Sequence, residues 1–174
     1  LLEPVGTILG KSAMYVWSDR LMAVRAHGGS AQRRSDARDL MRLLGLSFAA
    51  AGLLALALYA VMPVMVALLF GGGAFDARAI EATTFVGRLM VAQLPFHLVT
   101  WLVLYPLLGI FRQAAAMTYL VGYTTQIAFV WAFTPSLGVT GLALSYPAFT
   151  AMQAMFGVGL IIWAWQRASR AAGV

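Results

Sequence analysis

Residues 43–70 read LLGLSFAAAGLLALALYAVMPVMVALLF and contain no Asp, Glu, Lys or Arg. A helix needs about 20 apolar residues, each rising 1.5 Å, to cross about 30 Å of hydrocarbon, and this stretch exceeds that length. Within it, Ala49–Leu58 has no polar residues to alternate with the apolar ones, so it does not fit a strand of a membrane barrel. Because a helix satisfies its own backbone groups inside lipid, the stretch predicts a membrane-spanning helix.

Three more uncharged stretches follow this one, and a shorter apolar stretch, interrupted by Lys11, precedes it. Together they predict an all-α fold, a polytopic transmembrane helix bundle with four full spans and one partial N-terminal span. We expect these spans to form a single helical region of a longer protein and to cover residues 4–19, 43–70, 84–111, 114–133 and 138–166.

The composition excludes several classes of function. The chain has 174 residues, of which 61% are hydrophobic and only 10% charged, against about 25% charged in a typical soluble domain. It contains no cysteine, which excludes a disulfide, a thiolate metal site and a cysteine nucleophile. The glycine run at Gly71 lacks the Lys-Ser/Thr end of a phosphate-binding P-loop. We therefore expect no enzymatic activity, no cofactor and no metal site.

Basic residues are concentrated on one side of the predicted membrane. Nine of the twelve Lys and Arg residues fall in the loop 20–42, at Arg112 and in the C-terminal tail, and the opposite side carries only Arg78. The positive-inside rule then predicts that the loop 20–42 and the C-terminus are cytoplasmic. Asp36 is placed to cap a short helix that runs into the second span, and a solvated loop is an equally good interpretation. No aromatic residues interleave the arginines, so we expect no nucleic-acid partner.

Polar residues inside a membrane span are costly and often functional. Gln93 and His97 are four residues apart and so share one helix face. They are expected to face either an internal cavity or a hydrogen-bonding neighbour helix. Arg88 either faces the same cavity or extends to the outer interface, which is the interpretation we favour.

Three more polar residues complete the candidate substrate-binding or cavity-lining set. Gln126 lies in the middle of the fourth predicted span, where an amide usually joins two helices. Glu3 and Lys11 lie about two turns apart in the partial first span, which suggests a polar cavity lining, although Glu3 also suits the lipid interface. The complete set is Glu3, Lys11, Arg88, Gln93, His97 and Gln126.

Three segments, taken in order, resemble the lipid II flippase family (MviN/MurJ type) of the MOP flippase superfamily. They are EPVGTILG at Glu3–Gly10, LLFGGGAFD at Leu68–Asp76 and LGVTGLAL at Leu137–Leu144. The resemblance covers most of the chain and aligns it with roughly the eighth to twelfth helices of a 14-helix protein. The chain departs from the family pattern at Asp76, where Thr is usual, and at Gly109–Ala114, where an Asp and a Pro are missing.

The resemblance implies a transporter that flips an undecaprenyl-linked, lipid II-like glycan precursor across the bacterial inner membrane by alternating access, for cell-wall synthesis. Its implied partners are the lipid bilayer, the lipid-linked glycan and the missing N-terminal helices of the same transporter. The resemblance also maps Glu3 onto an acid that opens a cavity-lining helix. Two alternatives stay open: a cation-coupled multidrug exporter of the same superfamily, for which Glu3 would couple the ion, and a non-transporting membrane scaffold subunit.

Overall fold

The computed structural model describes residues 30–71, 76–110 and 112–171. Every regular element in these residues is a helix, as the sequence predicts. The helices in chain order are α2 (Ser30–Phe70), α3 (Ala77–Val91), α4 (Leu94–Ile110), α5 (Arg112–Leu137) and α6 (Val139–Ala171).

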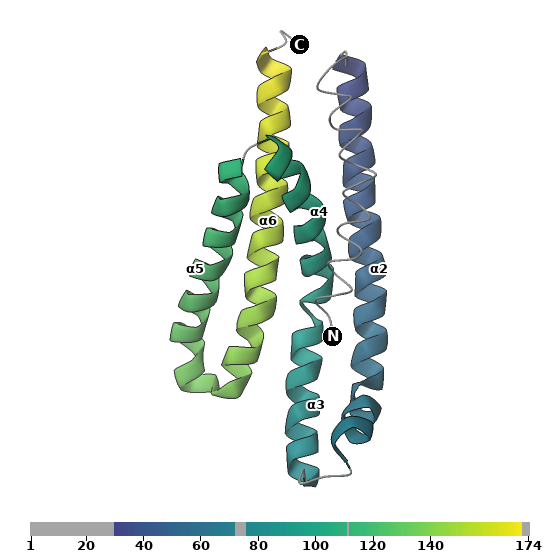
Figure 1. Cartoon of the computed structure of the whole chain (residues 1–174), viewed down its shortest axis with the longest axis vertical. Coiled ribbons are helices and arrows are strands. Elements are labelled where there is room, and N and C mark those ends of the chain that lie inside the picture. Colours follow the sequence, from purple (N-terminus) through teal and green to yellow (C-terminus); the bar gives the residue numbers. More distant parts are fainter. Residues whose placement is uncertain (1–29, 72–75, 111, 172–174) are drawn as a thin grey trace.

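The helices run along a common long axis, with α5 at one edge and α2 at the other (Figure 1). Between them, α6 packs against α3, α4 and α5, while α2 packs against α3 and α4. The first turns of α2 and the last turns of α6 lie at the same end of the molecule, and the last turn of α2 and the first turn of α3 lie at the opposite end (Figure 1). The two longest helices, α2 and α6, therefore have their charged ends at the same end of the molecule.

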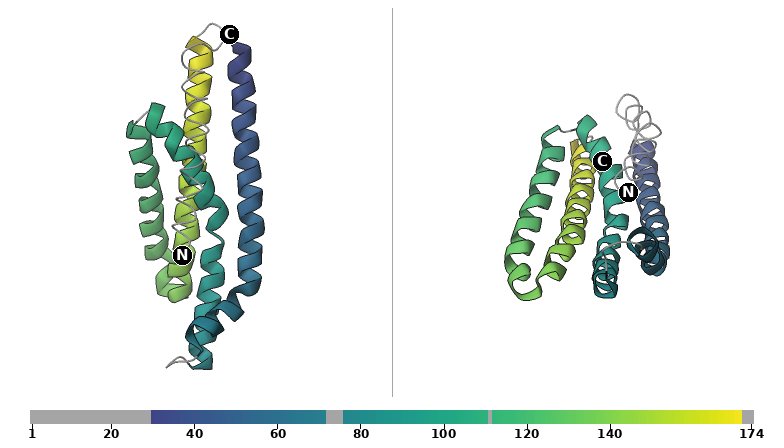
Figure 2. Two further views of the ribbon diagram at one scale, coloured as in Figure 1. Left: turned by 45° about the vertical axis from the view of Figure 1, so that its right-hand side comes forward. Right: turned by 60° about the horizontal axis from the view of Figure 1, so that its bottom comes forward.

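Helix α2 is longer than its predicted span. It has 41 residues, which is about 60 Å at 1.5 Å per residue, roughly twice the thickness of a hydrocarbon core. Residues 30–42, which the sequence assigns to the loop 20–42, are helical and continuous with the span. The helix ends at Phe70, where the Gly71 N–H donates to the Ala67 carbonyl at 2.8 Å, and its last turns bend away from the longer part (Figure 2).

Two short connections are set by single residues. Asp76 caps the start of α3, because its Oδ1 accepts a hydrogen bond from the Ala79 N–H at 2.7 Å. Gly138 alone joins α5 to α6, with a φ of 57° that a side chain would strain. Near this turn a Cβ on Gly141 would lie 2.9 Å from the Phe133 carbonyl. Glycine therefore allows the backbones of α5 and α6 to approach each other closely.

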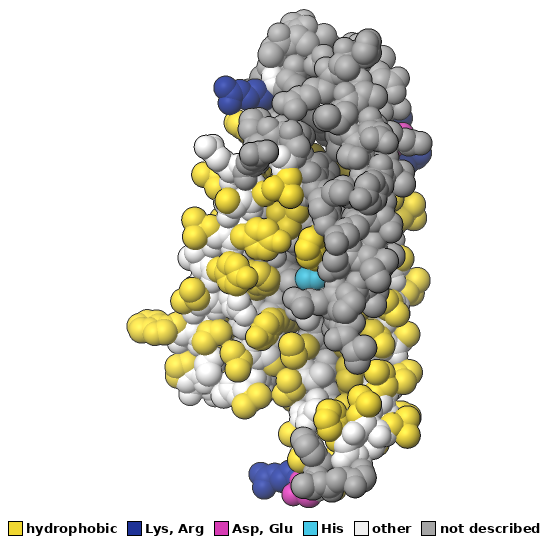
Figure 3. Space-filling model, viewed as in Figure 1, with side chains coloured by type: hydrophobic (Ala, Val, Ile, Leu, Met, Phe, Trp, Pro, Cys, Tyr) yellow, Lys and Arg dark blue, Asp and Glu magenta, His cyan; other side chains and the backbone are white. Residues whose placement is uncertain are grey.

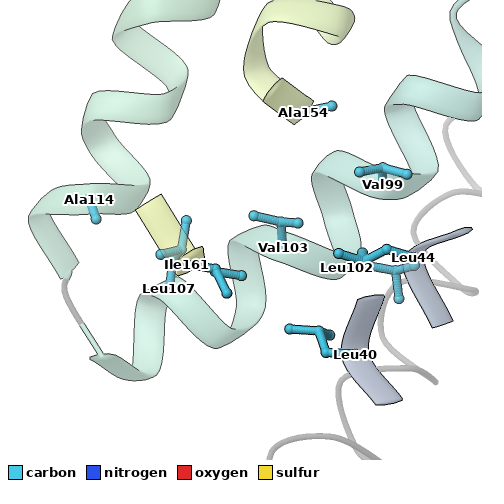
Figure 4. Close-up of a cluster of buried hydrophobic side chains, with 9 residues drawn as sticks. All are labelled: Leu40, Leu44, Val99, Leu102, Val103, Leu107, Ala114, Ala154 and Ile161. Carbon is cyan, nitrogen blue, oxygen red and sulfur yellow. The ribbon is translucent and has the colours of Figure 1, made fainter. Parts of the chain in front are cut away.

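The largest buried cluster joins four helices near the end of the molecule that holds the start of α2 (Figure 4). Val103 on α4 is completely buried at its centre. The cluster consists of Leu40 and Leu44 from α2, Val99, Leu102, Val103 and Leu107 from α4, Ala114 from α5, and Ala154 and Ile161 from α6. It fixes α4 against both α2 and α6.

Three helical segments of the described residues are long and apolar enough to cross a membrane: Arg38–Phe70, Ala77–Leu104 and Val139–Ala164. The second segment includes both α3 and α4. Three of the four predicted full spans are thus supported by length and apolarity; α5 falls outside this set, because Gly122, Thr124, Thr125 and Gln126 interrupt its apolar residues. The predicted partial span 4–19 lies outside the described residues.

The surface has the distribution of a membrane protein. On the face drawn in Figure 3, hydrophobic side chains cover the middle, and Lys, Arg, Asp and Glu appear only towards the two ends. Some of these apolar side chains are almost fully exposed, with Trp131 at 85% and Leu68 at 80%. Exposed apolar surface of this extent is rare in soluble monomers, and lipid accounts for it.

Candidate functional site

The predicted third span, 84–111, is broken about a third of the way along its length. Ala92 and Gln93 separate α3 from α4, and Figure 1 shows α4 continuing beyond α3 after this step. Pro95 has no N–H to donate to the Val91 carbonyl, so one helical hydrogen bond is missing next to the break. The break lies two residues before this proline and close to the midpoint of the candidate span Ala77–Leu104.

Hydrogen bonds on either side hold the break in a defined shape. The Gln93 N–H donates to the Met90 carbonyl at 3.2 Å, which is a tight bond over three residues. The Gln93 carbonyl then accepts the first bond of α4, from the His97 N–H at 2.8 Å. Gln93 thus ends one helix and begins the next, and its half-buried side chain projects from the break itself.

His97 and Trp101 form a hydrogen-bonded pair one turn beyond the break. The Trp101 Nε1–H donates to His97 Nε2 at 3.0 Å, and the two rings meet edge to face with centroids 6.1 Å apart. An accepting Nε2 carries no proton, so the neutral imidazole in this arrangement has its proton on Nδ1. His97, half-buried, is visible halfway along the molecule as the cyan side chain in Figure 3.

Gln93, His97 and Trp101 recur every four residues, so they form a polar stripe along one face of α4. The structure joins Gln93 and His97 by a backbone hydrogen bond and pairs the His97 side chain with Trp101. All three are half-buried. Next to this stripe, the Thr100 Oγ1 donates to the Phe96 carbonyl at 2.9 Å and to the Thr150 carbonyl of α6 at 3.3 Å, which fixes α4 against α6.

Gln153 on α6 is a polar residue that the sequence analysis missed. It is 2% exposed, and its Nε2 has no hydrogen-bond partner among the described residues. Gly122 of α5 makes room for it: a Cβ there would lie 2.4 Å from the Gln153 Cγ. In the sequence, Gln153 is an amide within the uncharged stretch 138–166, and such a residue is the same kind of signal that identified Gln126.

The other predicted residues do not join the stripe. Arg88 lies on α3 and contacts α2: its Nε donates to the Tyr59 carbonyl at 3.2 Å, and its guanidinium carbon lies 4.7 Å from the centre of the Tyr59 ring. Gln126 is half-buried on α5, which packs mainly against α6. Glu3 and Lys11 lie outside the described residues.

The stripe has the chemistry of a binding surface more than of a catalytic centre. An amide and an imidazole can donate and accept hydrogen bonds, an indole N–H can donate one, and the two rings offer flat faces for stacking. In the part of the chain that the structure describes, no three His, Cys, Asp or Glu side chains are grouped to hold a metal ion.

Comparison with known proteins adds no relative. No family model matches the chain, and neither a curated protein nor a solved structure matches it.

Proposed function

We propose that the chain is part of a polytopic transporter that flips a lipid-linked, lipid II-like glycan precursor across the bacterial inner membrane by alternating access. The observation that carries the proposal is the break at Ala92–Gln93, halfway through a candidate span and next to a polar stripe. The choice of a lipid-linked glycan comes from the resemblance of three segments to the lipid II flippase family.

A broken helix at the middle of a membrane favours transport over a purely structural role. Non-helical backbone at that depth is tolerated only where it is covered by protein or lines a water-filled cavity. Substrate sites of secondary transporters are typically built at such discontinuous helices. Gln93, His97 and Trp101 would meet the hydroxyl and amide groups of a sugar there, by hydrogen bonding and stacking.

The charges at the two ends support the proposed orientation. Arg38 and Arg42 are exposed at the start of α2, and Arg167 is exposed near the end of α6, with its guanidinium carbon 5.4 Å from the centre of the Trp163 ring. These helix ends lie together (Figure 1), and by the positive-inside rule they face the cytoplasm. Arg78, the one basic residue assigned to the opposite side of the membrane, lies in the first turn of α3.

The rest of the transporter would cover α2. In the most apolar 18-residue stretch of Arg38–Phe70, only 6% is buried. Most of the surface of this helix is therefore left for lipid or for other helices. In our proposal these are the N-terminal helices of the same transporter, which complete the cavity on the side of the polar stripe. The chain then contributes one wall of a larger transport path.

The test is a flipping assay with the intact protein in proteoliposomes. The probe is an undecaprenyl-pyrophosphate glycan that carries a fluorophore, and the readout is the probe's exposure to a membrane-impermeant quencher. Trp101→Phe keeps an aromatic ring but removes the N–H that donates to His97 Nε2, so we expect transport to fall about fivefold, the equivalent of one hydrogen bond of about 1 kcal/mol. Trp131→Phe, the same change at an exposed position of α5, should leave transport unchanged.

Three outcomes would contradict the proposal in different ways. Export of lipophilic cations without flipping of the glycan would favour the multidrug exporter. No transport of either compound by folded protein would favour the scaffold subunit. Glycan flipping with equal effects of Trp101→Phe and Trp131→Phe would keep the transporter and remove the stripe from its substrate path.

A further inference from the structure

Pro63 leaves one backbone carbonyl of α2 without its helix donor. In an α-helix the N–H of each residue donates to the carbonyl four residues earlier, so an N–H at residue 63 would donate to the Tyr59 carbonyl. Proline has no N–H, and its ring also pushes against that carbonyl. In apolar surroundings an unpaired carbonyl is costly. The Tyr59 carbonyl therefore needs a donor from outside its own helix.

Arg88 of α3 provides that donor. Its Nε–H donates to the Tyr59 carbonyl at 3.2 Å, and its guanidinium carbon lies 4.7 Å from the centre of the Tyr59 ring. One side chain thus contacts both the freed carbonyl and the aromatic ring of the same residue. Arg88 lies eleven residues into α3, about 16 Å from its first residue, so its charge lies well away from the start of the helix.

The packing around the contact brings α3 close to the bend. A Cβ on Gly87, next to Arg88, would lie 2.9 Å from the Met62 Sδ. Ala55, Val91 and Leu94 form a small buried cluster on the same interface. The last turns of α2, beyond the proline, bend away from the longer part of the helix (Figures 1 and 2). The arginine therefore lies at the point where α2 changes direction.

We propose that Arg88 is a positioning residue that replaces the hydrogen bond removed by Pro63, and thereby fixes both the bend of α2 and the position of α3 against it. A proline kink without a replacement donor is soft, because the two halves of the helix are joined by fewer bonds. Arg88 makes the kink more rigid, because it bonds the Tyr59 carbonyl of α2 to a second helix. The inference does not depend on which substrate the protein transports.

A double-mutant cycle on the intact protein in lipid nanodiscs tests this role. Arg88→Met removes the donor, and we expect it to lower the thermal unfolding midpoint by several degrees. Pro63→Ala restores the N–H that serves the Tyr59 carbonyl within α2. In the Pro63→Ala background the shift caused by Arg88→Met should fall to less than half. An equal shift in both backgrounds would overturn the proposal.

Three control variants separate this role from a general effect of the charge. Pro147→Ala removes a proline inside α6, far from Arg88 in the sequence, so the full shift from Arg88→Met should persist in that background. Tyr59→Leu removes the ring but keeps the carbonyl, so most of the shift should persist there too. Its loss with Tyr59→Leu would mean that the ring alone carries the contact, against the proposal. Arg88→Lys keeps a donor and should recover part of the stability.

The bend itself is measured with paired spin labels at Leu53 and Leu68, which are exposed on either side of Pro63. An unbent helix would separate these α-carbons by about 22 Å. We expect one narrow distance distribution in the native protein and in Arg88→Lys, and a broader one in Arg88→Met. Unchanged distributions in Arg88→Met would show that the arginine does not fix the bend, whatever its effect on stability.

Discussion

Gln153 combines almost complete burial with an amide nitrogen that has no partner among the described residues. A buried donor left unpaired costs about 1 to 3 kcal/mol. Gln153→Met has a similar size and removes the donor, so we expect it to stabilise the protein by about 1 kcal/mol in reversible unfolding in detergent. Gln126→Met, at a half-buried amide of α5, is the matched control and should have little effect. Destabilisation by Gln153→Met would show that the amide is paired in the folded protein.

At this scale the sequence predicted that Gln93 and His97 share a helix face but not the burial of Gln153. The first depends only on helix periodicity, since residues four apart share a face. The second depends on Gly122 of α5 lying opposite Gln153 of α6. This contact is set by the register of the two helices against each other. The contact from Arg88 to the Tyr59 carbonyl is of the same kind, because it depends on the register of α3 against α2.

At the scale of the element, the break between α3 and α4 lies next to Pro95. Pro95→Ala restores an N–H that can donate to the Val91 carbonyl, so α3 and α4 should join into a continuous helix. We expect the unfolding midpoint to rise and glycan flipping to fall, measured on the same preparation. Flipping at the native rate with a raised midpoint would show that the break has no part in transport.

The α5–α6 pair depends on close approach at selected glycines. A Cβ on Gly141 would lie 2.9 Å from the Phe133 backbone, which cannot move aside as a flexible side chain can, whereas a Cβ on Gly159 would meet nothing within 4 Å. Gly141→Ala should therefore destabilise the protein by about 1 to 3 kcal/mol. Gly159→Ala, in the same helix, should be neutral or stabilising by up to about 1 kcal/mol. Equal effects of the two variants on the unfolding midpoint would contradict the close packing.

Helix ends were predicted with uneven success, for local reasons. Helix α2 ends at Phe70, which is also the end of the predicted span 43–70, and Gly71 follows it, because glycine ends a helix by its own backbone freedom. Its start differs from both interpretations of the loop 20–42: α2 begins at Ser30, so Asp36 lies inside the helix and does not cap it. Pro95 inside the predicted span 84–111 indicates a disturbance of the helix, but whether a proline bends a helix or separates it into two depends on what packs around it.

At the scale of the whole molecule, the orientation in the membrane can be tested by labelling single cysteines in this cysteine-free chain. Ala77 and Ser136 are exposed near the α2–α3 connection and the α5–α6 turn, and Gln113 is exposed at the start of α5. An impermeant maleimide added outside the cell should label Ala77→Cys and Ser136→Cys but not Gln113→Cys. Labelling of Gln113→Cys alone would reverse the proposed orientation.

The single-residue connection at Gly138 also bears on how the protein enters the membrane during synthesis. Helix α5 is not among the segments that are apolar enough to cross a membrane, while α6 is, and a membrane insertion channel selects helices by their apolarity. With only Gly138 between them, α5 cannot move far from α6. Insertion of α5 is therefore coupled to the arrival of α6, and the two enter as one hairpin. We therefore expect substitutions that make α6 less apolar to reduce the amount of correctly inserted protein, even where they leave its stability and its transport activity unchanged.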